Sequence, residues 1–296
     1  MALLTGETAN RVISWGSRTL DFERRAHVMG ILNCTPDSFH PGSRLTTLRD
    51  AVKAADDMIR AGADILDVGG ESTRPGSDPV PVEEEIRRVV PVIEALRAAG
   101  DAVISVDTRN RRTAERALDA GADIVNDISA LSHDPGMARL VAERGVPVVL
   151  MHMRGTPKTM QGLAVYRDTV AEVLAELGAS VAAAIAAGVS PLRIIVDPGI
   201  GFGKKTEDNL RLLRGLAAFR SLGMPILVGL SRKRFIGDVT GRPVEERLAG
   251  TVAANTLAVL AGADIVRVHD VGEAVAMVRL IDAVRRAAVS EAAWTG

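Results

Sequence analysis

Polar residues able to do chemistry follow eight short apolar segments of this chain. They are carboxylates, amides, a hydroxyl and basic side chains, at Asn33, Asp67, Asp107, Asn126, His152, Asp197, Ser231 with Lys233, and Arg267 with His269. A single carboxylate after a strand often does no more than cap the next helix. Because nearly every segment ends in this way, we interpret the set as one polar pocket.

The pocket residues predict two halves of a ligand. One group offers hydrogen-bond acceptors for a flat heterocycle that carries N–H and NH2 donors: Asp107, Asn126 and Asp197. Buried carboxylates are unfavourable unless such donors or Lys233 accompany them. The other group would bind an anion, since an arginine fork matches phosphate oxygens: Asn33, Arg74, Arg267 and His269. The predicted ligand is a ring with a phosphate arm.

Metal-binding residues are sparse. His152 and His269 stand apart in the sequence and no His-x-His follows the first apolar segment, which disfavours a metallohydrolase barrel. The single cysteine, Cys34, excludes a multi-cysteine zinc site, and we interpret it as a packing residue. Mg2+ prefers oxygen ligands and substrate phosphates, so we expect Mg2+ beside Asn33 if the arm is a diphosphate.

The segment "GIGFGKK", residues 199–205, lacks the third glycine of a dinucleotide-binding motif, so we interpret it as a loop that needs backbone freedom. Phe202 in this loop and Phe39 in an earlier loop could stack on a flat ligand. Each could equally pack on its own neighbouring helix.

The elements that would position these residues alternate regularly. Eight Val- and Ile-rich segments predict buried strands at 27–33, 64–70, 103–108, 123–128, 146–153, 193–199, 225–231 and 264–270. Helical periodicity lies between them, which predicts an α/β fold, a single (β/α)8 TIM barrel. A Gly-Ala-Asp step recurs at Gly62, Gly121 and Gly262, where we expect the glycine to end a helix before the next strand.

The rest of the chain predicts one soluble domain. Residues 11–290 contain no Pro/Ser-rich linker, residues 1–10 are expected to be mobile, and "RVISWGSRTLDF" predicts a β-hairpin that closes the bottom of the barrel. The net charge of −1 disfavours nucleic acid and anionic membranes as partners. No secretory leader and no transmembrane span are expected. We therefore expect a cytoplasmic protein.

Eight motifs in order resemble those of the dihydropteroate synthase family. They are "NCTPDSF", "DVGGESTRPG", "SVDTR", "NDIS", "MHMRGTPKTMQ", "DPGIGFGK", "GLSRKRFIG" and "RVHDV", and they span about residues 27–285. The resemblance implies condensation of 6-hydroxymethyl-7,8-dihydropterin diphosphate with 4-aminobenzoate, giving 7,8-dihydropteroate and diphosphate. It also implies a homodimer formed through helices away from the pocket.

The resemblance also implies residue roles. The pterin-binding residues would be Asp107, Asn126, Met151, Asp197 and Lys233. The residues around aminobenzoate would be Phe39, Thr73, Arg74, Pro75, Phe202 and Arg234. The catalytic residues would be Asn33, Lys233, Arg267 and His269, with Asn33 also at the Mg2+.

The first loop departs from the family pattern. The family commonly continues Ser-Asp-Gly-Gly after "TPDSF", whereas this chain has His40-Pro41-Gly42-Ser43. A carboxylate there could stabilise positive charge on the pterin methylene, so we hypothesise that its absence lowers turnover or that Asp37 partly replaces it. We expect Pro41→Asp to turn over faster than the parent in a steady-state assay. Equal rates would make the missing carboxylate irrelevant.

Two other functions share the predicted pocket. A non-catalytic pterin-binding paralogue would keep the pocket after the first loop had changed. A methyltetrahydrofolate-dependent methyltransferase domain would share the barrel and the pterin floor, but "STRPG" and "SRKRF" disfavour it because it needs no aminobenzoate site. Diphosphate release that depends on aminobenzoate distinguishes the three.

Overall fold

The computed structural model describes residues 11–34, 44–72 and 76–287. A parallel barrel is formed by β3 (His27–Asn33), β4 (Ile65–Gly69), β5 (Val103–Asp107), β6 (Ile124–Asp127), β7 (Val148–Met151), β8 (Ile194–Asp197), β9 (Leu227–Val228) and β10 (Ile265–Val268). Neighbours pair in the order β8-β7-β6-β5-β4-β3-β10-β9. The ring closes where Val196 of β8 bridges Ile226, just before β9. The predicted (β/α)8 barrel is confirmed.

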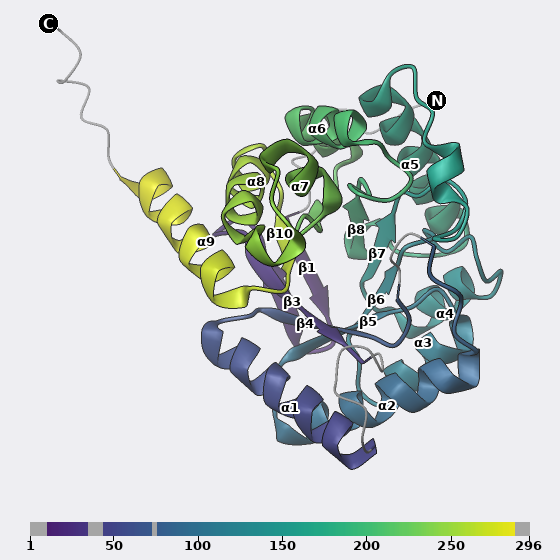
Figure 1. The fold of residues 1–296 in the computed structure, drawn as a ribbon. Coiled ribbons are helices and arrows are strands. Elements are labelled where there is room, and N and C mark those ends of the chain that lie inside the picture. Colours follow the sequence, from purple (N-terminus) through teal and green to yellow (C-terminus); the bar gives the residue numbers. More distant parts are fainter. Residues whose placement is uncertain (1–10, 35–43, 73–75, 288–296) are drawn as a thin grey trace, which may run out of the picture.

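The helices surround these strands, as Figure 1 shows. They are α1 (Arg44–Ala61), α2 (Val82–Ala99), α3 (Arg111–Asp119), α4 (Met137–Arg144), α5 (Thr169–Ala186), α6 (Thr206–Arg214), α7 (Arg234–Thr240), α8 (Leu248–Leu260) and α9 (Val271–Arg286). Short 3-10 turns are η2 (Met160–Leu163), η3 (Pro191–Arg193), η4 (Leu216–Leu222) and η5 (Val244–Glu246). The helices between the strands return the chain to the start of the next strand, so all strand C-terminal ends meet at one face.

The other end of the barrel is closed by a hairpin of β1 (Val12–Trp15) and β2 (Arg18–Asp21). Its apolar side chains form one buried cluster with residues near the strand starts: Ile13, Trp15, Leu20, Phe22, Met29, Ile65, Ile124, Val149, Ile195, Leu227 and Ile265. The indole N–H of Trp15 also donates to Asp123, at 3.4 Å. The predicted closing hairpin is confirmed, and the polar pocket can lie only at the opposite end.

The three Gly-Ala-Asp steps have the same geometry. Gly62, Gly121 and Gly262 have φ values of 100°, 108° and 107°, a left-handed conformation that favours glycine. The aspartates that follow accept hydrogen bonds from backbone N–H groups at the start of the neighbouring strand: Asp64 from Val28, Asp123 from Ile104 and Asp264 from Ile226. The repeat therefore turns the chain and ties adjacent strands together at the bottom.

Helix α5 is long and apolar enough, by length and composition, to cross a membrane. One side of it is buried in the barrel core through Val173, Leu177 and Val181. Its two glutamates, Glu172 and Glu176, both pair with Arg154 in the loop after β7. These contacts account for α5 as an outer helix of the barrel.

Candidate active site

An ion-pair network lies toward the carboxyl ends of β4, β5, β6 and β10, where the pocket is predicted, and we call it the floor of that pocket. The guanidinium of Arg267 donates from Nε to Asp67 Oδ2 at 2.6 Å and from Nη2 to Asp107 Oδ2 at 2.7 Å. Asn126 Nδ2 donates to the same Asp67 oxygen at 3.1 Å. Burial raises the pKa of the Asp107 carboxyl, against the effect of Arg267. Sequence segments up to 200 residues apart thus meet at one site.

The sequence placed Arg267 in an outer anion-binding group. In the structure its guanidinium instead lies on the floor carboxylates, and its side chain is 19% exposed. Arg267 stands one residue before β10 ends at Val268. From there its long side chain could reach either the outer group or the floor. An anion or a ring donor at this site would therefore compete with an existing ion pair.

Asp197 of β8 and Lys233, in the loop after β9, carry opposite charges that attract each other at the strand ends. Asp197 is buried and accepts the N–H of Gly199 at 2.7 Å. Burial raises the pKa of its carboxyl, while Gly199 and Lys233 oppose the shift. Burial disfavours the charged form of Lys233 as well, and so lowers the pKa of its ammonium to about 8. Met151 is buried on β7 in register with Asp197, so an apolar side chain adjoins this pair.

The loop of residues 199–203 contacts Lys233 through Gly201 and Phe202. Gly199, Gly201 and Gly203 have positive φ values, which confirms the predicted need for backbone freedom. A Cβ on Gly201 would come within 2.6 Å of the Lys233 side chain. The ring of Phe202 lies 4.0 Å from Lys233 Nζ, a cation–π contact. Phe202 therefore lies beside Lys233, and its contact with a ligand stays a prediction.

A second lysine, Lys204, donates hydrogen bonds to the backbone of this loop, and no role was predicted for it from the sequence. Its buried Nζ donates to the carbonyls of Gly199 and Phe202, at 2.9 and 3.0 Å, and lies 3.0 Å from Nδ1 of His152. Burial lowers the pKa of His152 to about 4, so its ring is neutral. Nδ1 therefore accepts from Lys204, and Nε2–H donates to Glu176 at 2.9 Å. His152 belongs to this network and not to the floor.

We expect Lys204→Met to lower the free energy of unfolding by about 2–3 kcal/mol, because the carbonyl of Phe202 and Nδ1 of His152 lose a charged donor. The matched control is Lys205→Met, the same substitution at the next, exposed position. Urea denaturation of both variants measures the difference. Equal unfolding free energies would show that Lys204 does not hold the loop.

Ser231 and His269 lie in the loops after β9 and β10, at the lip of the predicted pocket. Ser231 Oγ accepts the backbone N–H of His269 at 3.2 Å and lies 3.0 Å from its Nδ1. If the hydroxyl donates to Nδ1, the imidazole proton resides on Nε2 and makes His269 a donor. Asn33 is half-buried at the end of β3. The structure thus places Asn33 and His269 at strand ends on the same face as the floor.

The backbone beside Lys233 is unusual. Arg232 has a φ of 56°, uncommon for a residue with a side chain. Its guanidinium forms two hydrogen bonds with Asp270, at 2.6 and 3.1 Å. The backbone N–H of Arg232 donates to Oγ1 of Thr251. This clamp joins the loop that carries Lys233 to the residue after His269.

The predicted aminobenzoate residues are only partly described. Phe202 lies at the pocket, and Arg234 is the first residue of α7, with a side chain 91% exposed and 3.6 Å from Asp238. Phe39, Thr73, Arg74 and Pro75 lie outside the described residues, as do Pro41 and residues 1–10. Their roles stay predictions.

Metal ligands of the protein itself are few at this face. Within the described ranges, no group of three or more His, Cys, Asp or Glu side chains could hold a metal ion. The side chain of Asn33 offers one neutral oxygen, which fits a Mg2+ carried mainly by substrate phosphates. Cys34 is buried, and burial raises the pKa of its thiol to about 12, which confirms it as a packing residue.

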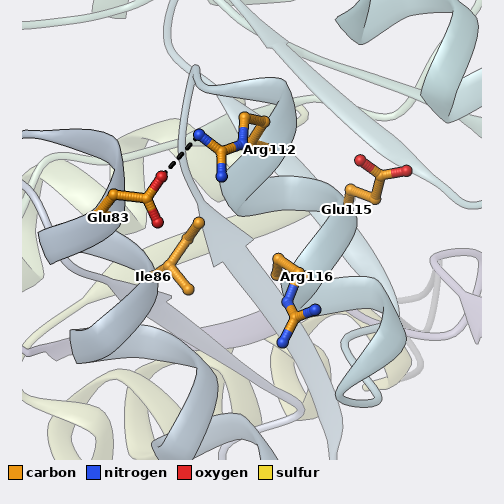
Figure 2. A pocket seen from close by; sticks show the side chains of 5 residues that line it. All are labelled: Glu83, Ile86, Arg112, Glu115 and Arg116. Atoms are coloured by element: carbon orange, nitrogen blue, oxygen red, sulfur yellow. Dashed lines mark ion pairs between the residues drawn. The ribbon is translucent and has the colours of Figure 1, made fainter.

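A hollow of about 290 Å³ lies elsewhere, on the outer surface between α2 and α3 (Figure 2). Glu83 and Arg112 pair across it at 2.6 Å, and both side chains are largely exposed. An exposed ion pair of this kind contributes little energy. None of the predicted site residues lines this hollow.

Comparison with known proteins matches this chain to one family. The sequence profile of the pterin-binding enzymes covers residues 29–269. The dihydropteroate synthase of Synechocystis sp. is 46% identical over 272 residues, 92% of this chain and 94% of that protein. That of Escherichia coli is 48% identical over 257 residues, 87% of this chain and 91% of that protein.

Solved structures agree. The Xanthomonas albilineans dihydropteroate synthase with 4-aminobenzoic acid superposes with a TM-score of 0.88 at 46% identity. It covers 94% of this chain and 100% of that one. The same enzyme in complex with 7,8-dihydropteroate gives a TM-score of 0.85 at 45% identity, with the same coverage.

Proposed function

Since the chain belongs to the pterin-binding enzymes, and within them to the dihydropteroate synthases, we propose that its strand-end pocket performs their reaction. The substrates are 6-hydroxymethyl-7,8-dihydropterin diphosphate and 4-aminobenzoate, and the products are 7,8-dihydropteroate and diphosphate. The enzyme is a transferase. The observation that carries this proposal is the meeting of acceptors and cations at one barrel face.

The pterin ring is proposed to bind the acceptors of the floor. Asp107, Asn126 and Asp197 come from three strands of one barrel and would accept from ring N–H and NH2 groups. Lys233 would donate to a ring acceptor, and Met151 supplies an apolar contact. The carboxylates are buried, so ring donors replace the water that they have lost.

The bond-breaking step separates charge. The C–O bond between the pterin methylene and diphosphate breaks, its electron pair leaves with diphosphate, and the amine of aminobenzoate forms the new C–N bond and loses a proton. The floor carboxylates suit positive charge on the methylene. Arg267 and the Nε2–H of His269 would stabilise the leaving oxygens.

Mg2+ is proposed to accompany the diphosphate, with Asn33 as a protein ligand. When bound, the ion would neutralise charge that develops on the leaving group. Asn33 would hold the ion through its side-chain oxygen.

Aminobenzoate is proposed to lie between Phe202 and the start of α7. Arg234 and the N-terminal peptide groups of α7 would face its carboxylate. Phe39, Thr73, Arg74 and Pro75 would complete this site.

The test is diphosphate release on mixing both substrates with Mg2+. Release that requires aminobenzoate supports the synthase. Tight binding of the pterin diphosphate without release would support the non-catalytic paralogue instead. Release that does not depend on aminobenzoate would contradict the synthase.

A homodimer is also proposed, through α8 and α9. Leu257 and Leu260 of α8, and Leu280 and Val284 of α9, are each more than half exposed. The two helices lie side by side, as Figure 1 shows, and Arg285 bonds to the carbonyl of Val259. Exposed apolar groups that gather in this way favour association.

We expect a mass near twice 31.2 kDa in sedimentation equilibrium, and a monomer for Leu280→Glu. Exposed Leu210 on α6 provides the control, Leu210→Glu, which should stay dimeric. A monomeric parent would overturn this proposal.

A cytoplasmic location is also proposed. It is supported by the single cysteine, which is buried, and by the packing of α5 in the barrel.

A further inference from the structure

Asp67 is the most buried member of the pocket floor, and no contact with substrate has been assigned to it above. Its side chain is 0% exposed. One oxygen, Oδ2, accepts both from Arg267 Nε, at 2.6 Å, and from Asn126 Nδ2, at 3.1 Å. The other, Oδ1, is buried without a hydrogen-bond partner in the described part of the chain. A single carboxylate oxygen thus joins a proposed pterin contact to a proposed diphosphate contact.

We propose that Asp67 is a positioning residue, which anchors Arg267 and orients the Asn126 amide so that the ring and its diphosphate are bound in register. The proposal rests on the synthase function given above and extends it to a residue without its own substrate contact.

The orientation of Asn126 follows from hydrogen-bond chemistry. A carboxylate can only accept, so the amide must turn its NH2 toward Asp67. Its Oδ1 then points away from Asp67 as an acceptor. A ring N–H requires that acceptor, and a flipped amide would oppose the ring with a donor.

The anchoring of Arg267 follows from its two branches. Nη2 is held by Asp107, which the ring is proposed to occupy, whereas Nε is held by Asp67. When the ring takes the Asp107 carboxylate, Asp67 remains as the partner that keeps the guanidinium at the site. Nη2 is then available for diphosphate.

The charge of Asp67 also acts on Asp107. The charged groups around the Asp107 carboxyl are Arg267, Asp67, Glu85, Asp127 and Lys233. Burial raises the pKa of Asp107 most; Arg267 lowers it, and Asp67 raises it. Removing the Asp67 charge therefore lowers the pKa of Asp107. In addition, Arg267 then pairs with Asp107 alone, and the ring must displace a stronger pair.

The experiment measures binding of 6-hydroxymethyl-7,8-dihydropterin, which lacks diphosphate, by calorimetry across pH. In Asp67→Asn the amide oxygen can still accept both bonds, so charge is removed and geometry is kept. We expect the Kd for the ring to rise about 10-fold, as for loss of one charge-assisted contact. We also expect the acidic limb of the binding profile to move to lower pH.

Two further variants separate a specific effect from general damage. Asp264→Asn neutralises another buried carboxylate that pairs with an arginine, Arg11, at the opposite end of β10, and should move neither quantity. Asp67→Glu keeps the charge but displaces it, so it should raise Kd and leave the limb in place. This variant decides the matter if Asp67→Asn does not fold.

The proposal would be overturned if folded Asp67→Asn kept the parental Kd and the parental acidic limb. It would also be overturned if Asp264→Asn changed these two quantities as much as Asp67→Asn does. An unchanged Kd in Asp67→Glu would do the same. If the parent itself bound no ring, the proposed function would fail instead, so the two failures are distinguishable.

Discussion

Arg267→Ala is expected to lower kcat/KM for diphosphate release by about 10³-fold. Loss of one donor that stabilises developing negative charge lowers kcat by about 10²–10³, and Arg267 in addition carries a full charge in a pocket where its side chain is 19% exposed. The effect should fall mainly on kcat, because the charge on the leaving oxygens grows as the C–O bond breaks. Single-turnover measurement of diphosphate release reports this step directly.

The control for this prediction is Arg267→Lys. Lysine keeps the charge but lacks the fork that reaches Asp67 and Asp107 together. We expect it to recover part of the lost rate. Circular dichroism must show that both variants are folded, since removing one partner of a buried pair destabilises a protein by about 3–5 kcal/mol. A folded alanine variant that cleaves at the parental rate would remove Arg267 from the catalytic residues.

The barrel could be predicted from the sequence because its signals are local and repeated. Each strand is a short β-branched segment, and each is separated from the next by helical periodicity. The glycines of the Gly-Ala-Asp steps also allowed the left-handed turns to be predicted. The carboxylates of Asp64, Asp123 and Asp264 could not be assigned partners, because those partners are N–H groups about 20 to 40 residues away.

The pocket could be located from the strand ends, but its internal pairing could not. Position on a strand says which face a residue reaches, whereas contacts depend on side-chain length and direction. Arg267 is long enough to lie on Asp67 and Asp107, and His152 turns away to Glu176 on α5. Lys204 looked like a loop lysine because only the fold shows the carbonyls that surround it. The sequence showed Asp67 as an acid near a strand end, but nothing in it indicated that Arg267 and Asn126 are its partners.

Lys233→Met is expected to raise the Kd of the pterin ring about 100-fold. The ammonium is one of the cations that act on the Asp197 carboxylate, and charge-assisted hydrogen bonds contribute about 1.5–3 kcal/mol. Methionine has a similar length and still packs on Phe202, so the loss reports charge and donor capacity rather than a cavity. Calorimetry with 6-hydroxymethyl-7,8-dihydropterin measures it without the chemical step.

The pH dependence gives a sharper form of the same prediction. Burial lowers the pKa of Lys233 to about 8, so the ammonium loses its proton as the pH rises through that value. Ring affinity of the parent should therefore fall above about pH 8, and Lys233→Met, already without the charge, should show no such fall. Lys205→Met, an exposed neighbour of the loop, should keep the parental profile. If the alkaline fall persisted in Lys233→Met, another group would be responsible, and Lys233 would not be the cation that the ring requires.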